Sequence, residues 1–147
     1  MNVEKINILL VEDDAGDQKL IKKSLVDQQI ANEVFVAESG EEALGYLSRS
    51  KAGESGCPKP NLVLLDLNMP GMGGREFLKR IKADEGLDAI PVVILTTSDS
   101  DQDVIESYKL YVSGYIKKPV NPKELKEVIR MLEEYWFAIR EQAQEGS

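Results

Sequence analysis

The sequence predicts a single α/β domain built as a (βα)5 doubly wound sheet, with five parallel strands and an extended C-terminal helix. Three observations support this fold class. Short apolar runs alternate along the chain with segments whose apolar residues recur at helical spacing. The runs at residues 62–65 and 92–95 are apolar without alternation, as expected for parallel strands covered on both faces. Right-handed crossovers between parallel strands then require helices on both sides of the sheet.

The first half of the chain supplies two strand–helix units. Residues 7–11 form an apolar run, and residues 15–27 follow it with apolar positions at helical spacing. Asp14 stands immediately before this helix, where an aspartate can act as an N-cap. Residues 33–37 alternate and predict a shorter, outer strand. The sequence Ser-Gly-Glu-Glu at 39–42 is a capping box, which predicts the start of a second helix.

The second half continues the alternation. Residues 48–60 predict a polar loop, which is either a tolerated surface insertion or a contact surface. After the central strand and a glycine-rich turn, residues 75–83 predict a helix, and residues 101–111 predict another with weak apolar content. The last strand is predicted at 114–116. Asn-Pro-Lys-Glu at 121–124 then combines an N-cap asparagine with a proline at the first helical position, which predicts the final helix.

Composition excludes several classes of protein. The net charge of −8 argues against a nucleic-acid-binding protein, because phosphate contacts need Lys and Arg. The chain has no histidine, which excludes Ser-His-Asp catalysis and HExxH-type zinc sites. No apolar stretch approaches the roughly 20 residues of a membrane span, and the N-terminus lacks the features of a secretion signal. A single cysteine, Cys57, fits a reducing compartment, so we expect a cytoplasmic protein.

Polar residues follow four of the predicted strands. Glu12, Asp13, Asp66, Thr96 and Lys118 each stand at or just past the end of an apolar run. In an open parallel sheet, functional groups collect outside the carboxyl ends of the strands, so these side chains are expected to share one pocket. Like carboxylates about 4 Å apart repel by roughly 4 kcal/mol at an effective dielectric of 20, and a cation would relieve this repulsion. Oxygen ligands favour a hard cation, and Mg²⁺ fits this description.

This pocket indicates phosphoryl chemistry. A carboxylate beside Mg²⁺ can act as the nucleophile in reactions that form an aspartyl phosphate. Lys118 would place a point charge near the phosphoryl group, and Thr96 would offer a hydroxyl donor. Glu12 and Asp13 are the better candidates for cation ligands, since Asp14 is assigned to the helix N-cap. The sequence leaves open whether the Lys118–Pro119 peptide bond is cis or trans.

The chain resembles the receiver domain of two-component response regulators. The match covers about residues 6–132, with its motifs in the same order and spacing. The segments that carry the resemblance are Leu10-Val11-Glu12-Asp13-Asp14, Leu64-Leu65-Asp66-Leu67-Asn68-Met69-Pro70-Gly71, Thr96-Thr97-Ser98 and Gly114-Tyr115-Ile116-Lys117-Lys118-Pro119.

The resemblance implies a function for the pocket. Asp66 would accept a phosphoryl group from the histidine of a sensor kinase, with Lys118 as the phosphate partner. Mg²⁺ would be held by the side chains of Asp13 and Asp66 and the backbone carbonyl of Asn68, with Glu12 assisting. The chain would therefore be a signalling phosphoacceptor rather than an enzyme.

The resemblance also implies a topology and a switch. The strand order would be 2-1-3-4-5, the flavodoxin-like order, and Thr96 and Tyr115 would form the switch pair. One receiver domain would occupy residues 1–147, with a core at about 6–132 and a C-terminal helix extension at about 133–147.

The chain is also similar to single-domain regulators that are paired with bacterial phytochromes, so a phytochrome is a candidate kinase. The cues are Pro60-Asn61-Leu62, Gly74-Arg75-Glu76, the long loop before the third strand, and Tyr135-Trp136-Phe137.

The final helix is predicted to be longer than the sheet. From Pro122 to about residue 143 it would span roughly 33 Å at 1.5 Å per residue, whereas a six-residue strand covers only about 20 Å. Its apolar residues recur at spacings of four and three, as in a coiled coil. The apolar overhang, which predicts homodimerisation or docking to a partner, comprises Tyr135, Trp136, Phe137 and Ile139. The alternatives are that these side chains fold back on the domain or that the tail is disordered.

Three other interpretations fit part of the sequence. A Mg²⁺-dependent phosphatase with an aspartyl-phosphate intermediate usually has a second acid two residues after the nucleophile, where this chain has Asn68. A flavin- or nucleotide-binding module would need a phosphate-binding glycine motif, and Gly71-Met72-Gly73-Gly74 lacks the required spacing. A receiver cut from a longer regulator is the third; the tail forms no DNA-binding unit, so a stand-alone protein is expected.

Overall fold

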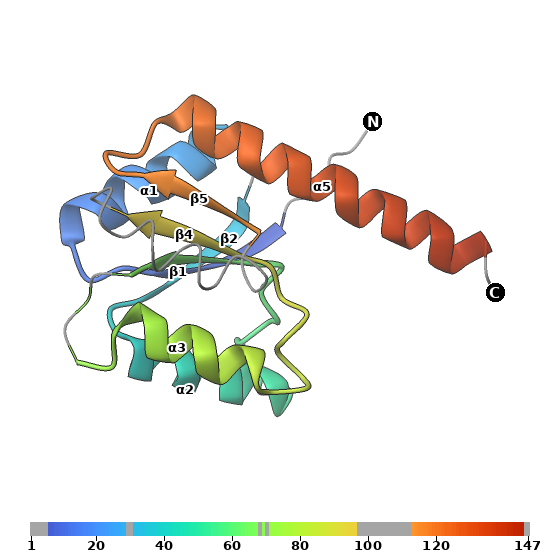
Figure 1. Ribbon diagram of the computed structural model, residues 1–147, viewed down its shortest axis with the longest axis horizontal. Coiled ribbons are helices and arrows are strands. Elements are labelled where there is room, and N and C mark those ends of the chain that lie inside the picture. The colour runs from blue at the N-terminus through green and yellow to red at the C-terminus, as the bar shows by residue number, and fades with distance from the viewer. Residues whose placement is uncertain (1–5, 29–30, 68, 70, 97–112, 146–147) are drawn as a thin grey trace.

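The structure is a computed structural model that describes residues 6–28, 31–67, 69, 71–96 and 113–145, with the side chains of 31, 32, 96, 133 and 135–145 outside this description. From β1 to β4 its strands and helices alternate along the chain, and β5 and α5 complete the described elements (Figure 1). In chain order they are β1 Ile6–Val11, α1 Ala15–Asp27, β2 Ala31–Ala37, α2 Gly40–Lys51, β3 Leu62–Asp66, α3 Gly73–Lys82, β4 Val92–Thr96, β5 Gly114–Lys117 and α5 Pro122–Glu145.

The five strands form one parallel sheet in the order β2-β1-β3-β4-β5. Val11 at the end of β1 pairs with Ala37 of β2 and with Leu65 of β3, and Asp66 pairs with Leu95 of β4. The carboxyl ends of the central strands therefore meet at one edge of the sheet. The predicted fold class and strand order are confirmed.

Each face of the sheet packs on its own apolar cluster. α2 and α3 cover one face and α1 and α5 cover the other, as Figure 1 shows. Alternate residues of the central strands enter opposite clusters, as a strand period of two requires. On β1, for example, Leu9 packs toward α2 and α3, whereas Leu10 packs toward α1 and α5. The central strands β3 and β4 are buried on both faces, as their unbroken apolar runs predict.

Two helices begin at the predicted N-caps. A side-chain oxygen of Asp14 accepts the N–H of Asp17 at 2.8 Å, and Asn121 Oδ1 accepts the N–H of Lys123 at 2.8 Å. These bonds satisfy N–H groups that have no partner within the helix. Asp14 therefore orients the first turn of α1 beside the end of β1.

The start of α2 is also as predicted, but its end is not. Ser39 Oγ accepts the N–H of Glu42 at 3.1 Å, as in a capping box, while Glu42 Oε2 accepts the N–H of Glu38 at 3.0 Å. The helix continues to Lys51, so the predicted loop at 48–60 is wrong in its first four residues. Serines lower the helix propensity of this stretch, but the basic residues of its last turn complement the helix dipole.

Other boundaries differ by two residues. β2 begins at Ala31 rather than 33, and α3 begins at Gly73 rather than 75. The Lys118–Pro119 peptide bond, left open by the sequence, is cis. The helix predicted at 101–111 lies outside the described residues.

α5 has 24 residues and is therefore about 36 Å long. Figure 1 shows its C-terminal half running beyond the sheet, as the sequence predicts for the backbone. The side chains of the predicted overhang, Tyr135, Trp136, Phe137 and Ile139, lie outside the described residues. Among the described residues, no helix combines the length and the apolar character that crossing a membrane requires.

Candidate functional site

The candidate site lies where β1 and β3 end side by side. Glu12 follows the last residue of β1, and Asp66 is the last residue of β3. The pairing of Val11 with Leu65 brings these two strand ends together. The N–H of Glu12 donates to the carbonyl of Ala37 on β2 at 3.0 Å, which holds the chain in line with the sheet as it leaves β1.

Three of the predicted carboxylates converge at this point. One oxygen from each of Glu12, Asp13 and Asp66 lies within 4.8 Å of the others. Glu12 and Asp66 are buried, whereas Asp13 is exposed at the rim. Buried carboxylates this close repel one another unless positive charge lies nearby.

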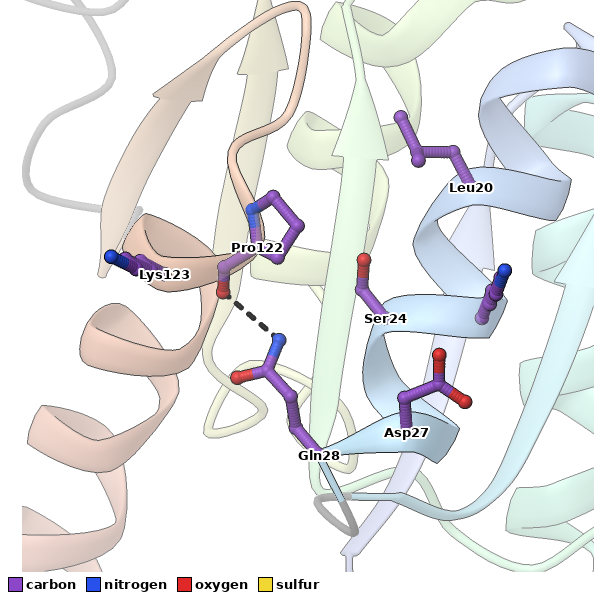
Figure 2. A pocket seen from close by; sticks show the side chains of 7 residues that line it. Leu20, Ser24, Asp27, Gln28, Pro122 and Lys123 are labelled. Carbon is purple, nitrogen blue, oxygen red and sulfur yellow. Dashed lines mark hydrogen bonds between the residues drawn. The ribbon is translucent and has the colours of Figure 1, made fainter.

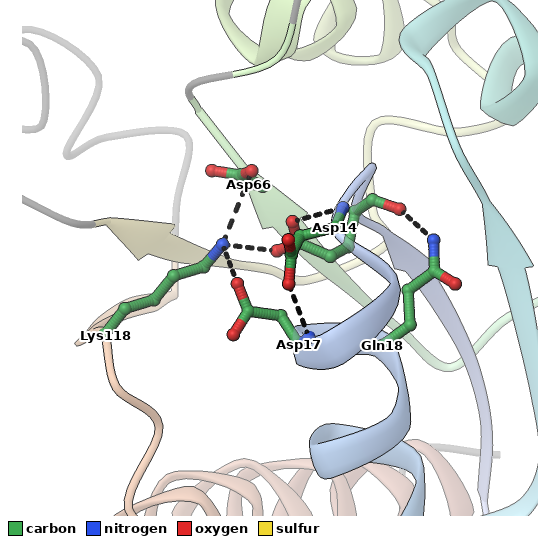
Figure 3. Close-up of polar contacts among 6 residues, drawn as sticks. Asp14, Asp17, Gln18, Asp66 and Lys118 are labelled. Carbon is green, nitrogen blue, oxygen red and sulfur yellow. Dashed lines mark hydrogen bonds and ion pairs between the residues drawn. The ribbon is translucent and has the colours of Figure 1, made fainter.

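Lys118 provides that positive charge. Its ammonium lies 2.5 Å from Glu12 Oε2, 3.0 Å from Asp17 Oδ2 and 3.4 Å from Asp66 Oδ2. Figure 3 shows Asp17 and Asp66 on either side of the Lys118 nitrogen. Only 8% of the Lys118 side chain is exposed, so water screens these contacts weakly. Lys118 is thus a buried counter-ion for the acidic group.

Burial and charge shift the protonation of both partners. Burial raises the pKa of Glu12 to about 7, although its hydrogen bonds to Lys118 and to the N–H of Asp14 act in the opposite direction. Burial disfavours the charged form of Lys118, but the hydrogen bonds to Glu12 and Asp17 and the charge of Asp66 outweigh it and raise the pKa of Lys118. The Lys118 ammonium therefore stays charged, whereas Glu12 titrates near neutral pH.

Sequence reasoning missed two residues of α1 that contact this group. Asp17 binds Lys118, and Gln18 Nε2 donates to the backbone carbonyl of Glu12 at 2.6 Å. Both lie in the first turns of α1, which begins just past the end of β1. Both follow the Glu12-Asp13-Asp14 motif within six residues. This spacing could have predicted their contacts, since the first turn of a helix after a strand lies at the same edge of the sheet.

Gly74 allows α3 to start close to the end of β3. A Cβ atom at this position would lie 2.5 Å from the carbonyl oxygen of Asp66 and 2.8 Å from the Cα of Leu67. Both are backbone atoms that cannot move aside cheaply. Gly74 therefore fixes how near the helix comes to the residue that carries the buried carboxylate.

The structure describes the other predicted site residues, Thr96, Tyr115 and Asn68, only in part. Thr96 ends β4 opposite Lys117 of β5, so its backbone reaches the same sheet edge, but its side chain lies outside the described residues. Tyr115 on β5 is 49% exposed. Asn68, whose carbonyl was predicted to bind Mg²⁺, also lies outside the described residues.

A second concave region lies between α1 and the start of α5, away from the acidic group (Figure 2). Leu20 and Ser24 line it from α1 and Pro122 from α5, and Gln28 Nε2 donates to the carbonyl of Pro122 at 3.0 Å. This hydrogen bond ties the C-terminal end of α1 to the first turn of α5. The groove holds none of the carboxylates that converge at the end of the sheet.

The donors at the sheet edge fit a hard divalent cation. Three carboxylates within 4.8 Å offer the oxygen ligands that Mg²⁺ and Mn²⁺ bind in proteins. The positively charged Lys118 ammonium lies beside two of these carboxylates, Glu12 and Asp66. The arrangement can therefore bind a cation and hold an anionic group beside the ammonium.

Comparison with known proteins identifies the family. The model of the response regulator receiver domain matches residues 8–130. Response regulator Rcp1 of Synechocystis sp. is 42% identical over 130 residues, which are 88% of each chain, and the solved Mn²⁺-bound form of Rcp1 has a TM-score of 0.69 over 89% of this chain and 94% of that chain, at 40% identity.

Two further solved structures are similar over most of their length. The bacteriophytochrome response regulator AtBRR is 41% identical, with a TM-score of 0.74 over 87% of this chain and 92% of that chain. The phosphorylated cyanobacterial phytochrome response regulator RcpA is 38% identical, with a TM-score of 0.71 over 92% of this chain and 96% of that chain. With its parallel five-stranded sheet and the acidic group at the sheet's edge, the chain belongs to the response regulator receiver domain family of two-component signalling.

Proposed function

We propose that this protein is a phosphoacceptor response regulator and that Asp66 takes a phosphoryl group from a sensor histidine kinase. The observation that carries the proposal is the buried Asp66 carboxylate, which lies 3.4 Å from the Lys118 ammonium and within 4.8 Å of Glu12 and Asp13. Receiver domains are signalling proteins, and this one has no histidine of its own. The phosphoryl donor is therefore a histidine of another protein.

In the proposed transfer an oxygen of Asp66 attacks the phosphorus of the phosphohistidine. The new O–P bond forms as the N–P bond breaks, and the bonding electron pair leaves with the imidazole nitrogen. Mg²⁺, when bound, neutralises charge on the phosphoryl oxygens. Asp13 and Asp66 would hold it through their side chains and Asn68 through its carbonyl, with Glu12 assisting.

Lys118 would hold the transferred group. Its raised pKa keeps the ammonium charged, and its burial strengthens the attraction to an anion. Lysine binds phosphate as a compact point charge, so it does not need a fixed planar geometry. The Lys118 ammonium already contacts the carboxylates of Glu12 and Asp66, so it lies within reach of a phosphoryl group on Asp66.

The phosphoryl group would act as a signal through Thr96 and Tyr115. Phosphorylation adds charge and strong acceptor oxygens to Asp66. Thr96 would turn to donate to one of these oxygens, and Tyr115, now 49% exposed, would turn inward. A Thr96→Ala protein is expected to be phosphorylated without this change, which the fluorescence or NMR signals of Tyr115 would report. A normal Tyr115 response in that variant would rule the switch out.

The proposed partner is a sensor kinase of the phytochrome class. Two structural relatives are named as phytochrome or bacteriophytochrome response regulators, at 38–41% identity. A cytoplasmic location follows from such a partnership, because the kinase and its regulator must meet. We also propose a homodimer through the C-terminal part of α5. In this proposal residues 1–147 form one receiver domain.

The phosphoacceptor is tested with acetyl phosphate and Mg²⁺. Mass spectrometry of the wild-type protein is expected to show one added phosphoryl group, located on Asp66 by peptide mapping. Asp66→Asn removes the nucleophile and should abolish the adduct. Asp27→Asn, on the far end of α1, removes an exposed aspartate and should leave the yield unchanged. Equal labelling of Asp66→Asn and wild type would overturn the proposal.

A further inference from the structure

Asp17 holds Lys118 from the opposite side to Asp66. Its Oδ2 atom accepts a hydrogen bond from the Lys118 ammonium at 3.0 Å, and Figure 3 shows its side chain reaching the ammonium from α1. The N–H of Asp17 donates to the Asp14 side chain, so the start of α1 is fixed by its cap. The Asp17 carboxylate is 30% exposed, at the rim of the acidic group.

The contacts of Lys118 leave Asp66 as its most distant partner. An ammonium has three N–H donors. Three carboxylates lie around it, at 2.5 Å for Glu12, 3.0 Å for Asp17 and 3.4 Å for Asp66. The two shorter contacts are hydrogen bonds, one to Glu12 at the end of β1 and one to Asp17 of α1. The third N–H donor is left for Asp66, and a phosphoryl oxygen there would share the ammonium with Glu12 and Asp17.

Asp17 weakens the hold of a phosphoryl group on this ammonium in two ways. Its hydrogen bond keeps the ammonium toward α1, and its negative charge repels an anionic group on Asp66. Glu12 differs, because it belongs to the group of carboxylates that can bind the cation, whereas Asp17 does not lie in that group. Replacing Asp17 therefore removes a partner of Lys118 without removing a candidate metal ligand.

We infer that Asp17 is a positioning residue that retains Lys118 on the side of α1 and competes with the phosphoryl group for its ammonium. It thereby lowers the affinity of the pocket for that group and favours the unphosphorylated state. This inference rests on the proposed function of Asp66. It adds a residue of α1 whose charge affects how strongly the Lys118 ammonium can bind a phosphoryl group on Asp66.

Beryllofluoride with Mg²⁺ is the probe, because it occupies the place of a phosphoryl group on a carboxylate without covalent turnover. Titration calorimetry of the full chain compares wild type, Asp17→Asn and Asp27→Asn. Asp17→Asn is expected to bind beryllofluoride about threefold more tightly, the scale of a partly exposed ion pair. Asp27 lies ten residues further along the same helix, about 15 Å away, so its variant should bind as wild type does.

Reductive methylation of Lys118 tests the contact without any phosphoryl chemistry. Peptide mass spectrometry measures the methylation rate of Lys118 against the exposed lysines of the same protein. Loss of the Asp17 carboxylate should raise the rate at Lys118 about threefold, and Asp27→Asn should not change it.

The outcomes separate this inference from the proposed function. Unchanged methylation of Lys118 in Asp17→Asn, or beryllofluoride binding equal to or weaker than wild type, would overturn the role of Asp17 alone. Absence of beryllofluoride binding by the wild-type protein in the presence of Mg²⁺ would overturn the proposed function and the competition with it.

Discussion

At the scale of single residues, the acidic pocket depends on one buried cation. Glu12 and Asp66 are nearly inaccessible to water, and Lys118 is the ammonium between them. Removing one partner of a buried ion pair leaves the other charge without compensation, which is much more costly than replacing the whole pair. Lys118 therefore contributes to stability as well as to the proposed chemistry.

We predict that Lys118→Met lowers the free energy of unfolding by about 3 kcal/mol at about pH 8. The loss should be smaller at about pH 5, because a proton then neutralises Glu12, whose pKa burial has already raised to about 7. Added Mg²⁺ should restore part of the loss by replacing the missing positive charge. Urea unfolding at the two pH values, with and without Mg²⁺, measures each effect.

Lys51→Met is the matched control for this prediction. Lys51 pairs with Asp84 at 2.8 Å, but its side chain is 52% exposed, so its removal should change stability little at either pH. A Lys118→Met protein as stable as Lys51→Met would contradict the role of Lys118 as counter-ion.

Gly74→Ala is expected to disturb Asp66, the proposed phosphoacceptor. Its Cβ would lie 2.5 Å from the Asp66 carbonyl oxygen, so the start of α3 or the end of β3 must shift. We predict a loss of about 2 kcal/mol in the free energy of unfolding and slower labelling by acetyl phosphate. At Gly86 the atoms nearest to an added Cβ belong to the flexible end of Lys51, at 2.7 Å, so Gly86→Ala should cost much less. Equal stability and equal labelling of the two variants would argue against a close-contact role for Gly74.

At the scale of elements, α2 anchors the loop that leads to β3. The Tyr46 hydroxyl donates to the carbonyl of Pro58 at 2.7 Å, and the Tyr46 ring packs against Phe35 of β2 with centroids 5.1 Å apart. The loop begins at Gly53, whose φ of 77° closes the helix in the left-handed region. One side chain of α2 thus ties the loop to the edge of the sheet.

Tyr46→Phe tests this tie, and its effect depends on pH. The hydrogen bond should contribute about 1 kcal/mol to the free energy of unfolding at neutral pH. Burial raises the pKa of Tyr46 from 10.0 to about 12, so the native state favours the protonated phenol. The contribution is therefore complete below about pH 10 and is lost as the pH rises through about 12. Urea unfolding of both proteins from neutral to alkaline pH should show the difference shrinking in that interval, whereas a constant difference would contradict it.

At the scale of the whole molecule, α5 exceeds the sheet that it covers. Leu125 and Ile129 in its first half are buried against the sheet, and the backbone continues to Glu145 beyond it (Figure 1). The second half of the helix carries the predicted apolar overhang. Burying such a segment would require another surface, and in the proposed homodimer a second copy of the chain would supply it.

We predict that truncation after Glu134 removes dimerisation without unfolding the domain. The buried residues of α5 all precede this position among those described, so the two apolar clusters of the sheet are retained. Analytical ultracentrifugation should give a concentration-dependent mass for the full chain and a constant monomer mass for the truncated one. Identical masses for both chains at all concentrations would rule out a dimer through this segment.

The local patterns of the sequence identified the elements and part of the site. Apolar runs located the strands, and the side chains of Asp14 and Asn121 located two helix starts, because strand period and capping involve neighbours in the chain. The end of α2 was placed four residues too early, because the propensities of single serines are weak and the helix continued to Lys51. Glu12 and Asp66 were predicted to share a pocket because parallel strands end at one sheet edge.

The sequence by itself determined the fold class, the family, and the acidic residues at the ends of the strands, since each depends on spacing along the chain. Only the tertiary structure decided how the helices α1 and α3 contact the residues at the strand ends. The contact of Asp17 with Lys118 joins positions 101 residues apart, and the fit of Gly74 against Asp66 depends on how a helix packs on a strand end. Such distances of a few ångströms arise from packing between elements, and no pattern along the chain specifies them.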